Sequence, residues 1–161
     1  MVLRKNKYVY VIVAAALLLY IPLFFFRDFT PTNELKYINI ADHMLKSGDW
    51  IKLQFDGALY TDKPPLYFWI ITLIRLVTGK YTLFSIGLTV CVLPAIVTGL
   101  DIYRFLTENN YDKKRACSVV LILYTILYFA GSVLVIRMDI LMTMFIVRAL
   151  ISFYNRAEKN K

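Results

Sequence analysis

The sequence predicts an all-α integral membrane protein with four transmembrane helices and two amphipathic surface helices in the first outer loop. Two observations lead to this fold class: apolar runs that approach the length of a membrane span, and basic clusters at the ends of these runs. Only 19% of the 161 residues are charged, against about 25% in a soluble domain, which agrees with a membrane protein. We expect one membrane module over residues 1–161.

The first apolar run, Tyr8–Phe26, follows the basic residues Arg4, Lys5 and Lys7. A cleaved signal peptide needs a small-residue cleavage site after a shorter apolar core. This run ends in three phenylalanines and Arg27, which offer no such site. The first span is therefore expected to be an uncleaved anchor over residues 8–26.

The charges around the later apolar runs decide how many of them cross the membrane. The run at 66–78 is shorter than the roughly 20 residues that a span needs. If it lies on the surface, the basic N-terminus, the basic loop 112–115 and the basic tail 156–161 share one side, which the positive-inside rule makes cytoplasmic. We therefore predict a multi-pass protein of the inner or plasma membrane with both termini cytoplasmic; a short true span at 66–78 is the alternative. The predicted spans are 8–26, 81–106, 116–136 and 140–154.

The outer loop, residues 27–80, is expected to hold surface helices at 31–47 and 64–78. Thr30-Pro31 is a helix-start signal and Gly48 a helix end. Pro64-Pro65 and Gly79 bound the second helix in the same way, and Asp56-Gly57 predicts a turn between the two. The face of the first helix expected to be buried consists of Leu35, Ile38, Ala41 and Leu45.

This topology brings polar residues that are distant in the sequence to the outer membrane face. Ionisable residues close to the ends of spans are candidates for function. The residues that converge there are Asn33, Glu34, Asp62, Lys63, Arg137 and Asp139.

At these residues the chain resembles the polyprenyl-phosphate-sugar glycosyltransferases of the C-type fold, from Arg27 to about Leu150. The most similar groups are the bacterial aminoarabinose transferases of lipid A and the protein O-mannosyltransferases. The order and spacing of four pieces carry the resemblance. They are Asn33-Glu34-Leu35-Lys36-Tyr37, Ser47-Gly48-Asp49-Trp50, Asp62-Lys63-Pro64-Pro65-Leu66 and Arg137-Met138-Asp139.

The resemblance implies a reaction at the outer membrane face. A sugar is moved from a polyprenyl-phosphate carrier, usually undecaprenyl phosphate in bacteria, to a lipid, glycan or protein acceptor, with inversion. An acidic residue helps to deprotonate or orient the acceptor hydroxyl. Because the leaving group is already a phosphate, no strong general acid is needed.

The family opens its first surface helix with an Asp-Glu pair whose aspartate is the expected catalytic carboxylate. This chain has Asn33-Glu34 there, and an asparagine cannot accept a proton near neutral pH. Either Glu34 takes the catalytic role, or Asn33 only orients the acceptor, or activity is absent. The structural alternative for Glu34 is to complement the helix N-terminus.

Three further positions match the family's site. Lys63 matches the residue that meets the lipid phosphate, where a lysine is a compact cation; simple snorkelling is its alternative. Asp139 matches the second catalytic acid, which holds a hydroxyl or shares a divalent metal; pairing with Arg137 is its alternative. Asp62 is expected to contact the sugar or a metal, or to cap the following helix. No cofactor is implied with certainty, and the metal stays open.

Two functions from different classes remain open on the sequence. The first is the N-terminal portion of a membrane glycosyltransferase, expected to be incomplete alone because family members are several times longer. The second is a non-catalytic small membrane protein, either a truncated remnant or an assembly partner of such an enzyme, and Asn33 favours it. Nucleic-acid binding is not expected despite the net charge of +8, because the basic residues lie at the ends of spans rather than on one face.

Overall fold

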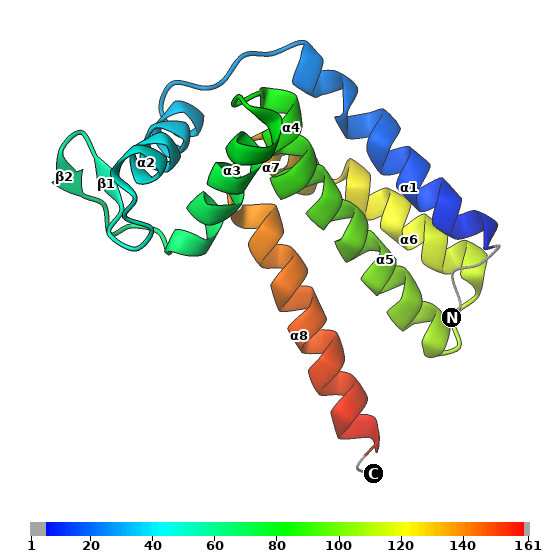
Figure 1. Cartoon of the computed structure of the whole chain (residues 1–161). Helices are drawn as coiled ribbons and strands as arrows, with labels where there is room; N and C mark the ends of the chain where they lie inside the picture. Colours follow the sequence, from blue (N-terminus) through cyan, green and yellow to red (C-terminus); the bar gives the residue numbers. More distant parts are fainter. Residues whose placement is uncertain (1–5, 160–161) are drawn as a thin grey trace.

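The computed structural model of the protein describes residues 6–159, which form helices joined by short loops and one small hairpin (Figure 1). Arg4, Lys5 and Lys161, which were expected to mark the cytoplasmic side, lie outside the described residues. The N-terminal helix α1 spans Lys7–Tyr20 and continues as a 3-10 helix, η1, over Pro22–Phe25. The α-helix ends before Pro22 because proline has no N–H to continue the hydrogen-bond ladder.

The coarse prediction of an all-α membrane protein is confirmed by the lengths and compositions of the helices. Three segments of the described chain are long and apolar enough to cross a membrane: Lys7–Phe25, Leu83–Glu108 and Asp139–Glu158. A fourth is counted if the bent pair α6 (Lys113–Thr125) and α7 (Leu127–Leu134) forms one span. The exact number of four spans stays a prediction.

The segment Leu83–Glu108 is one continuous rod made of three pieces. Helix α4 (Leu83–Gly87) leads into a π-helical turn, η2 (Leu88–Val92), and then into α5 (Leu93–Glu108). Pro94 lies two residues after the π-helical turn, and its missing N–H and bulky ring explain why the α-helical ladder widens there.

Helix α6 (Lys113–Thr125) starts at Asp112, whose carboxylate accepts the backbone N–H groups of the first turn. It is separated from α7 (Leu127–Leu134) by a 65° bend. The bend lies at Ile126, which leaves the helical conformation with a ψ of 123°. Helix α8 follows over Asp139–Lys159.

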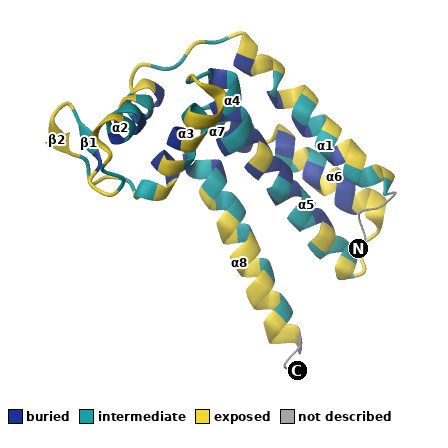
Figure 2. Cartoon of the chain, in the orientation of Figure 1, coloured by how far each residue is buried: buried dark blue, intermediate teal, exposed yellow. Residues whose placement is uncertain are grey.

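The apolar helices pack closely where α5 meets α6. A Cβ at Gly99 would collide with the ring of Tyr124, so the glycine allows the close approach. The Tyr124 hydroxyl donates to the carbonyl of Ala95 at 3.2 Å, and the Tyr20 hydroxyl of α1 donates to the carbonyl of Tyr124 at 2.7 Å. Figure 2 shows that buried residues line the inner faces of α1, α5 and α6, whereas most of α8 is exposed.

The chain between the apolar segments Lys7–Phe25 and Leu83–Glu108 forms a separate polar region. Helix α2 (Glu34–Ser47) and helix α3 (Pro65–Thr78) lie side by side and run in the same direction. The ring of Tyr37 contacts that of Phe68 near the start of each helix, and the Thr72 hydroxyl lies 3.4 Å from the Ala41 carbonyl further along.

Three details of this region differ from the sequence analysis. Between the helices, Gln54–Phe55 (β1) and Ala58–Leu59 (β2) form a two-stranded antiparallel hairpin around the predicted Asp56-Gly57 turn. Helix α2 begins at Glu34, and its N-cap residue is Asn33 instead of Thr30. Of the face that was expected to be buried, only Ala41 is buried, because packing on α3 turns a neighbouring stripe inwards. The buried residues of α2 are Glu34, Tyr37, Ile40, Ala41 and Met44.

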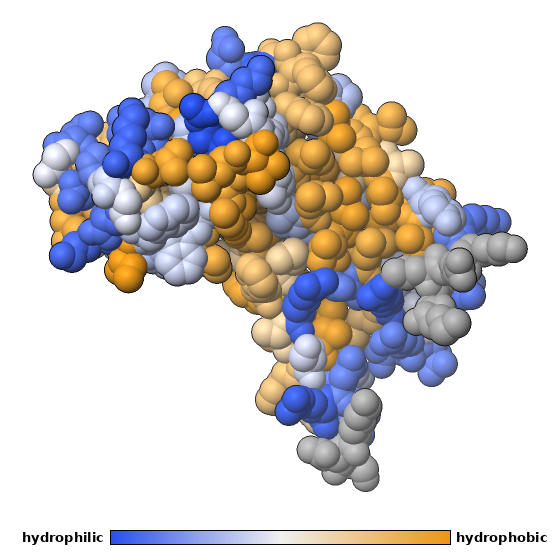
Figure 3. Space-filling model, viewed as in Figure 1, coloured by the Kyte–Doolittle hydropathy of each residue, from blue (hydrophilic) through white to orange (hydrophobic). Residues whose placement is uncertain are grey.

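The surface separates into polar ends and an apolar middle (Figure 3). Hydrophilic residues cover the region of α2 and the hairpin, and a second hydrophilic area lies near the two ends of the chain. The start of α1 lies beside the end of α5, where the Asn6 amide donates to the Tyr103 hydroxyl at 2.7 Å. This arrangement, with an apolar belt between two polar ends, is typical of a protein that sits across a bilayer.

Candidate functional site

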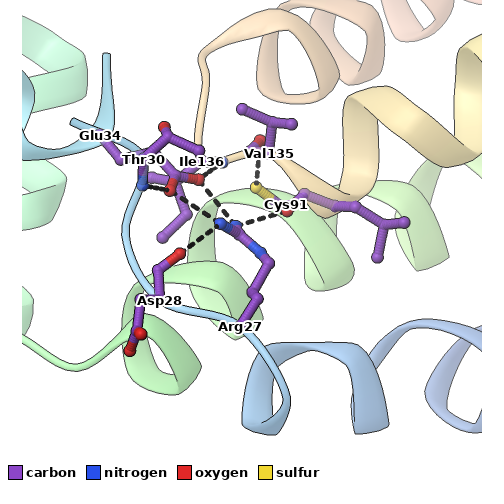
Figure 4. Close-up of polar contacts among 8 residues, drawn as sticks. Arg27, Asp28, Thr30, Glu34, Cys91, Val135 and Ile136 are labelled. Carbon is purple, nitrogen blue, oxygen red and sulfur yellow. Dashed lines mark hydrogen bonds and ion pairs between the residues drawn. The ribbon is translucent and has the colours of Figure 1, made fainter. Parts of the chain in front are cut away.

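The carboxylate of Glu34 is completely buried and accepts four hydrogen bonds (Figure 4). Two come from the Arg27 guanidinium at 2.8 and 2.7 Å. The other two come from backbone N–H groups, of Thr30 at 2.7 Å and of Ile136 at 2.6 Å. Every acceptor position of the carboxylate is therefore occupied within the chain.

The protonation of Glu34 follows from these contacts. Burial alone would raise the pKa of Glu34, but the Arg27 hydrogen bonds, the two backbone donors and the Arg27 charge outweigh it and lower the pKa below its usual 4.5. The residue is therefore a buried carboxylate anion at neutral pH. Because Glu34 is buried and all its hydrogen-bond acceptor positions are occupied, it acts as a structural anchor. It has no lone pair left to accept the proton of a substrate hydroxyl.

The Glu34 anchor also fixes the connection between α7 and α8. Besides its two hydrogen bonds to Glu34, Arg27 donates to the carbonyls of Asp28 and Leu134. The thiol of Cys91 in η2 lies 3.5 Å from the carbonyl of Val135, and Ile136 is held by Glu34 itself (Figure 4). The loop before α2 and the π-helical turn thus both hold the short stretch that precedes Arg137 and Asp139.

Asp62, Arg137 and Asp139 lie within electrostatic reach of the buried tyrosine Tyr37. Burial raises the pKa of Tyr37; the Arg137 charge lowers it, and the carboxylates of Asp139 and Asp62 raise it. Residues from the loop before α3 and from the start of α8 are thereby brought near one side chain of α2. The sequence analysis predicted that these polar residues share one side of the protein, and the structure brings these three close together.

A second buried tyrosine, Tyr67 of α3, extends this group. Its hydroxyl is buried and has no hydrogen-bond partner among the described residues. Burial raises the pKa of Tyr67 well above its usual value, and Glu34 and Asp139 add to the shift with smaller effects. The hydroxyl is therefore protonated and has a free proton to donate.

The remaining predicted residues occupy more open positions. Lys63 is half-buried, and it forms no ion pair with any residue that the structure describes. Asn33 is exposed, and its side chain makes no capping hydrogen bond. Asp62 does not cap α3, because Pro64 precedes that helix without a side-chain cap; its carboxylate lies 3.9 Å from the Lys36 ammonium.

Asp139 forms an ion pair with the Arg137 guanidinium at 3.0 Å. This pair was the alternative that the sequence left open to a role of Asp139 in the site. Both side chains stay partly exposed and line a cavity of about 440 Å³ together with Tyr128 and Ser132 of α7. The pair therefore faces open space and can be reached by a ligand. Among residues 6–159, no three His, Cys, Asp or Glu side chains cluster closely enough to hold a metal ion.

The sequence analysis missed three members of this group: Arg27, Tyr37 and Tyr67. Arg27 directly follows an apolar run, and a charge at such a position was a usable signal of a buried partner. Tyr37 lies within a motif that was singled out, but its burial against α3 has no local signal.

Comparisons with known proteins agree with the resemblance. The family model described as dolichyl-phosphate-mannose-protein mannosyltransferase matches residues 62–161. An undecaprenyl phosphate-alpha-4-amino-4-deoxy-L-arabinose arabinosyl transferase of Pseudomonas savastanoi pv. phaseolicola is 31% identical over 89% of this chain and 26% of its own length. The enzyme of the same name from Enterobacter sp. is 26% identical over 94% of this chain and 27% of its own length.

The chain spans about a quarter of the length of these curated relatives. No solved structure matches it significantly. The family model covers more than half of the chain, including Asp62, Lys63, Arg137 and Asp139. The chain therefore belongs to the dolichyl-phosphate-mannose-protein mannosyltransferase family of membrane glycosyltransferases.

Proposed function

We propose that this chain is the N-terminal portion of a membrane glycosyltransferase that takes a sugar from a polyprenyl-phosphate carrier at the outer membrane face. The acceptor is a lipid, glycan or protein hydroxyl. The observation that carries the proposal is Lys63, a half-buried cation with no anionic partner among the described residues, directly beside Asp62. A half-buried, unpaired lysine next to an apolar helix suits a lipid phosphate.

The chemistry follows from the charges around Lys63. Its ammonium would balance the negative charge that gathers on the departing phosphate, which lowers the transition-state energy. Asp139, partly exposed at the cavity beside α7, is the carboxylate that would orient or deprotonate the acceptor hydroxyl. The ion pair with Arg137 fixes the Asp139 carboxylate beside the cavity, where its partly exposed oxygens can accept a hydrogen bond from a hydroxyl.

We propose a structural role for Glu34 instead of the catalytic one expected from the motif. Its four hydrogen bonds leave no acceptor position for a substrate proton. Asn33, exposed directly before it, is within the same loop and would orient the acceptor through its amide. Asp62 would contact the sugar.

A binding experiment tests the proposal. Labelled undecaprenyl phosphate should bind the chain in detergent, and Lys63→Gln should weaken binding roughly tenfold, the usual loss for one charge-assisted hydrogen bond. Lys63→Arg should keep most of the affinity. The matched control is Lys52→Gln, an exposed lysine on the same polar side. Unchanged binding in Lys63→Gln would contradict the assignment.

A second candidate function is a non-catalytic partner protein that binds the lipid carrier without turnover. The buried and saturated Glu34, together with Asn33 in place of the expected aspartate, favours it. The two functions are separated by sugar transfer from a polyprenyl-phosphate donor. Because the chain spans about a quarter of its relatives' length, transfer is measured with the chain joined to the remaining C-terminal part of such a relative. Transfer that is lost in Asp139→Asn supports the enzyme; Lys63-dependent binding without transfer in this joined protein supports the partner protein.

A further inference from the structure

A second polar pocket runs along α2 and reaches the last turn of α3 and the turn that follows it. It has a volume of about 650 Å³ and is lined by side chains of α2 and of the turn that leads into α4. Lys63 precedes the first residue of α3, whereas this pocket includes Arg75 in its last turn, so about 15 Å of helix separates the two. The pocket is therefore distinct from the proposed sugar-carrier site.

The pocket has an excess of positive charge. Its cations are Lys46, Arg75 and Lys80, and Asp42 is its one carboxylate. Asp42 pairs with Lys46 at 2.5 Å, so that pair is neutral. Arg75 and Lys80 have no ion pair with any described residue. Two positive charges thus remain for an anion from outside the chain.

The hydroxyl of Tyr81 adds a second, independent sign of a missing ligand. It is buried, and no residue that the structure describes forms a hydrogen bond with it. Burial raises the pKa of Tyr81 to about 12, so the hydroxyl stays protonated and can donate. The Arg75 guanidinium lies 5.5 Å from the centre of the Tyr81 ring. A buried donor left unsatisfied is unfavourable, and a bound anion would supply the missing hydrogen-bond acceptor.

Helix-dipole compensation does not account for all of this arrangement. Lys46 and Arg75 lie in the last turns of α2 and α3, where cations are favourable. Lys80 lies beyond both helices, and the Tyr81 hydroxyl carries no charge. The turn that presents them is held by the Thr78 hydroxyl, 2.8 Å from the Ile74 carbonyl and 2.7 Å from the Lys80 carbonyl.

An apolar groove of about 540 Å³ begins at the same turn. It runs between α3 and α4, and its lining includes Leu73, Val77, Phe84 and Leu88. Its only polar lining residues are small hydroxyl side chains at its edge, Thr78, Ser85 and Thr89. A cationic pocket and an apolar groove therefore both border the end of α3 and the turn that leads into the membrane-length rod Leu83–Glu108.

We infer that this pocket and groove together bind an anionic membrane phospholipid. Arg75, Lys80 and the Tyr81 hydroxyl would hold the head-group phosphate, and the groove between α3 and α4 would hold part of an acyl chain. A free phosphate would use the pocket but not the groove, and this is why we assign the lipid. The site would fix the C-terminal end of α3 at the membrane surface.

Native mass spectrometry of the full chain, with dioleoyl-phosphatidylglycerol and dioleoyl-phosphatidylcholine in competition, tests this inference. The wild-type chain should retain the anionic lipid several-fold over the zwitterionic one. The Arg75→Gln/Lys80→Gln chain should lose this preference, and the shape-conserving Tyr81→Phe should weaken it. The charge-matched control is Lys52→Gln/Lys113→Gln, which removes two exposed cations elsewhere and should keep the preference.

Three results would overturn the inference. One is an unchanged preference in both Arg75→Gln/Lys80→Gln and Tyr81→Phe. Another is an equal loss of preference in the control, which would show general attraction between charges. The third is displacement of phosphatidylglycerol by excess inorganic phosphate, which would make the site a phosphate site without a lipid. Tyr81→Phe removes only a hydroxyl, so its result does not depend on the folding of the double variant.

Discussion

Arg27 and Glu34 form a two-point ion pair between the end of the first apolar segment and the start of α2. The glutamate is inaccessible to solvent, whereas the arginine side chain keeps 24% of its exposure. Such a pair is costly to break on one side, because the remaining charge stays buried without a partner. Much of the geometry around Arg137 and Asp139 depends on it, since the same carboxylate holds the backbone of Ile136.

Replacing Arg27 by glutamine should therefore strongly destabilise the protein. We expect a loss of about 3–5 kcal/mol in the free energy of unfolding, the usual cost of leaving one buried charge unpaired. Thermal unfolding in detergent, followed by circular dichroism, measures it. Arg137→Gln, which breaks the exposed ion pair with Asp139, is the control and should cost less than about 1 kcal/mol. Equal losses in the two variants would contradict the anchor role of Arg27.

The same anchor predicts a loss of stability in acid. The folded state holds the pKa of Glu34 below its usual 4.5, so the folded state binds the proton less readily than the unfolded chain. The stabilisation is fully present above about pH 4.5 and is lost as the pH falls below this value towards the folded-state pKa. Unfolding temperatures measured between neutral pH and pH 3 should show this decline, and Glu34→Gln should make it shallower. A wild-type curve that matches that of Glu34→Gln would refute the prediction.

Gly99 should tolerate no side chain. A methyl group there would meet the Tyr124 ring, so Gly99→Ala should destabilise the contact between α5 and α6 by about 1–3 kcal/mol, the usual cost of overpacking. Gly131→Ala in α7 is the matched control, because a Cβ there meets nothing within 4 Å; it should be neutral or slightly stabilising. Thermal unfolding of the two variants in the same detergent decides. The prediction fails if Gly99→Ala is as stable as Gly131→Ala.

Tyr67→Phe should separate a structural role from a functional one. The hydroxyl has no partner among the described residues, so its removal should leave the unfolding temperature unchanged or raise it slightly. If the hydroxyl instead donates to a bound sugar or phosphate, affinity for labelled undecaprenyl phosphate should fall several-fold. Tyr124→Phe is the control, since that hydroxyl bonds to Ala95 and its loss should lower stability. A stability loss in Tyr67→Phe equal to that in Tyr124→Phe would refute the assignment of a free hydroxyl.

The outer position of residues 27–80 can be tested by labelling. A cysteine at Lys80 should react with an impermeant maleimide added outside intact cells, because α3 is expected to lie on the membrane without crossing it. A cysteine at Lys113, in the opposite loop, should react only after the membrane is opened. The native Cys91 and Cys117 are both buried and are replaced by alanine as a precaution. Labelling of Lys80→Cys only after opening would show that α3 crosses.

The sequence predicted most where the signal was local. The turn at Asp56-Gly57 and the ends of α2 and α3 at Gly48 and Gly79 follow from backbone chemistry, because the glycines take positive φ values of 71° and 75° there. The motif around Lys63 was likewise recognisable as a contiguous stretch.

The sequence could not predict contacts that depend on packing between distant segments. Periodicity selected a face of α2 containing Leu35, but that side chain is 45% exposed, because α3 packs against the stripe of Tyr37 and Met44. Glu34 looked catalytic because its position in the motif was visible, while one of its partners is a backbone N–H at Ile136, 102 residues away. Backbone donors carry no sequence signal. The sequence therefore cannot distinguish a carboxylate whose hydrogen-bond positions are all occupied from one that is free to react.

The parallel course of α2 and α3 has a consequence for the segment that joins them. Two neighbouring helices that run the same way need a return path about 21 Å long, which about seven extended residues would span. The connection, residues 48–64, is more than twice as long and contains the hairpin β1–β2. Connectivity alone therefore does not require the hairpin, and the parallel packing of α2 on α3 would tolerate a shorter connection.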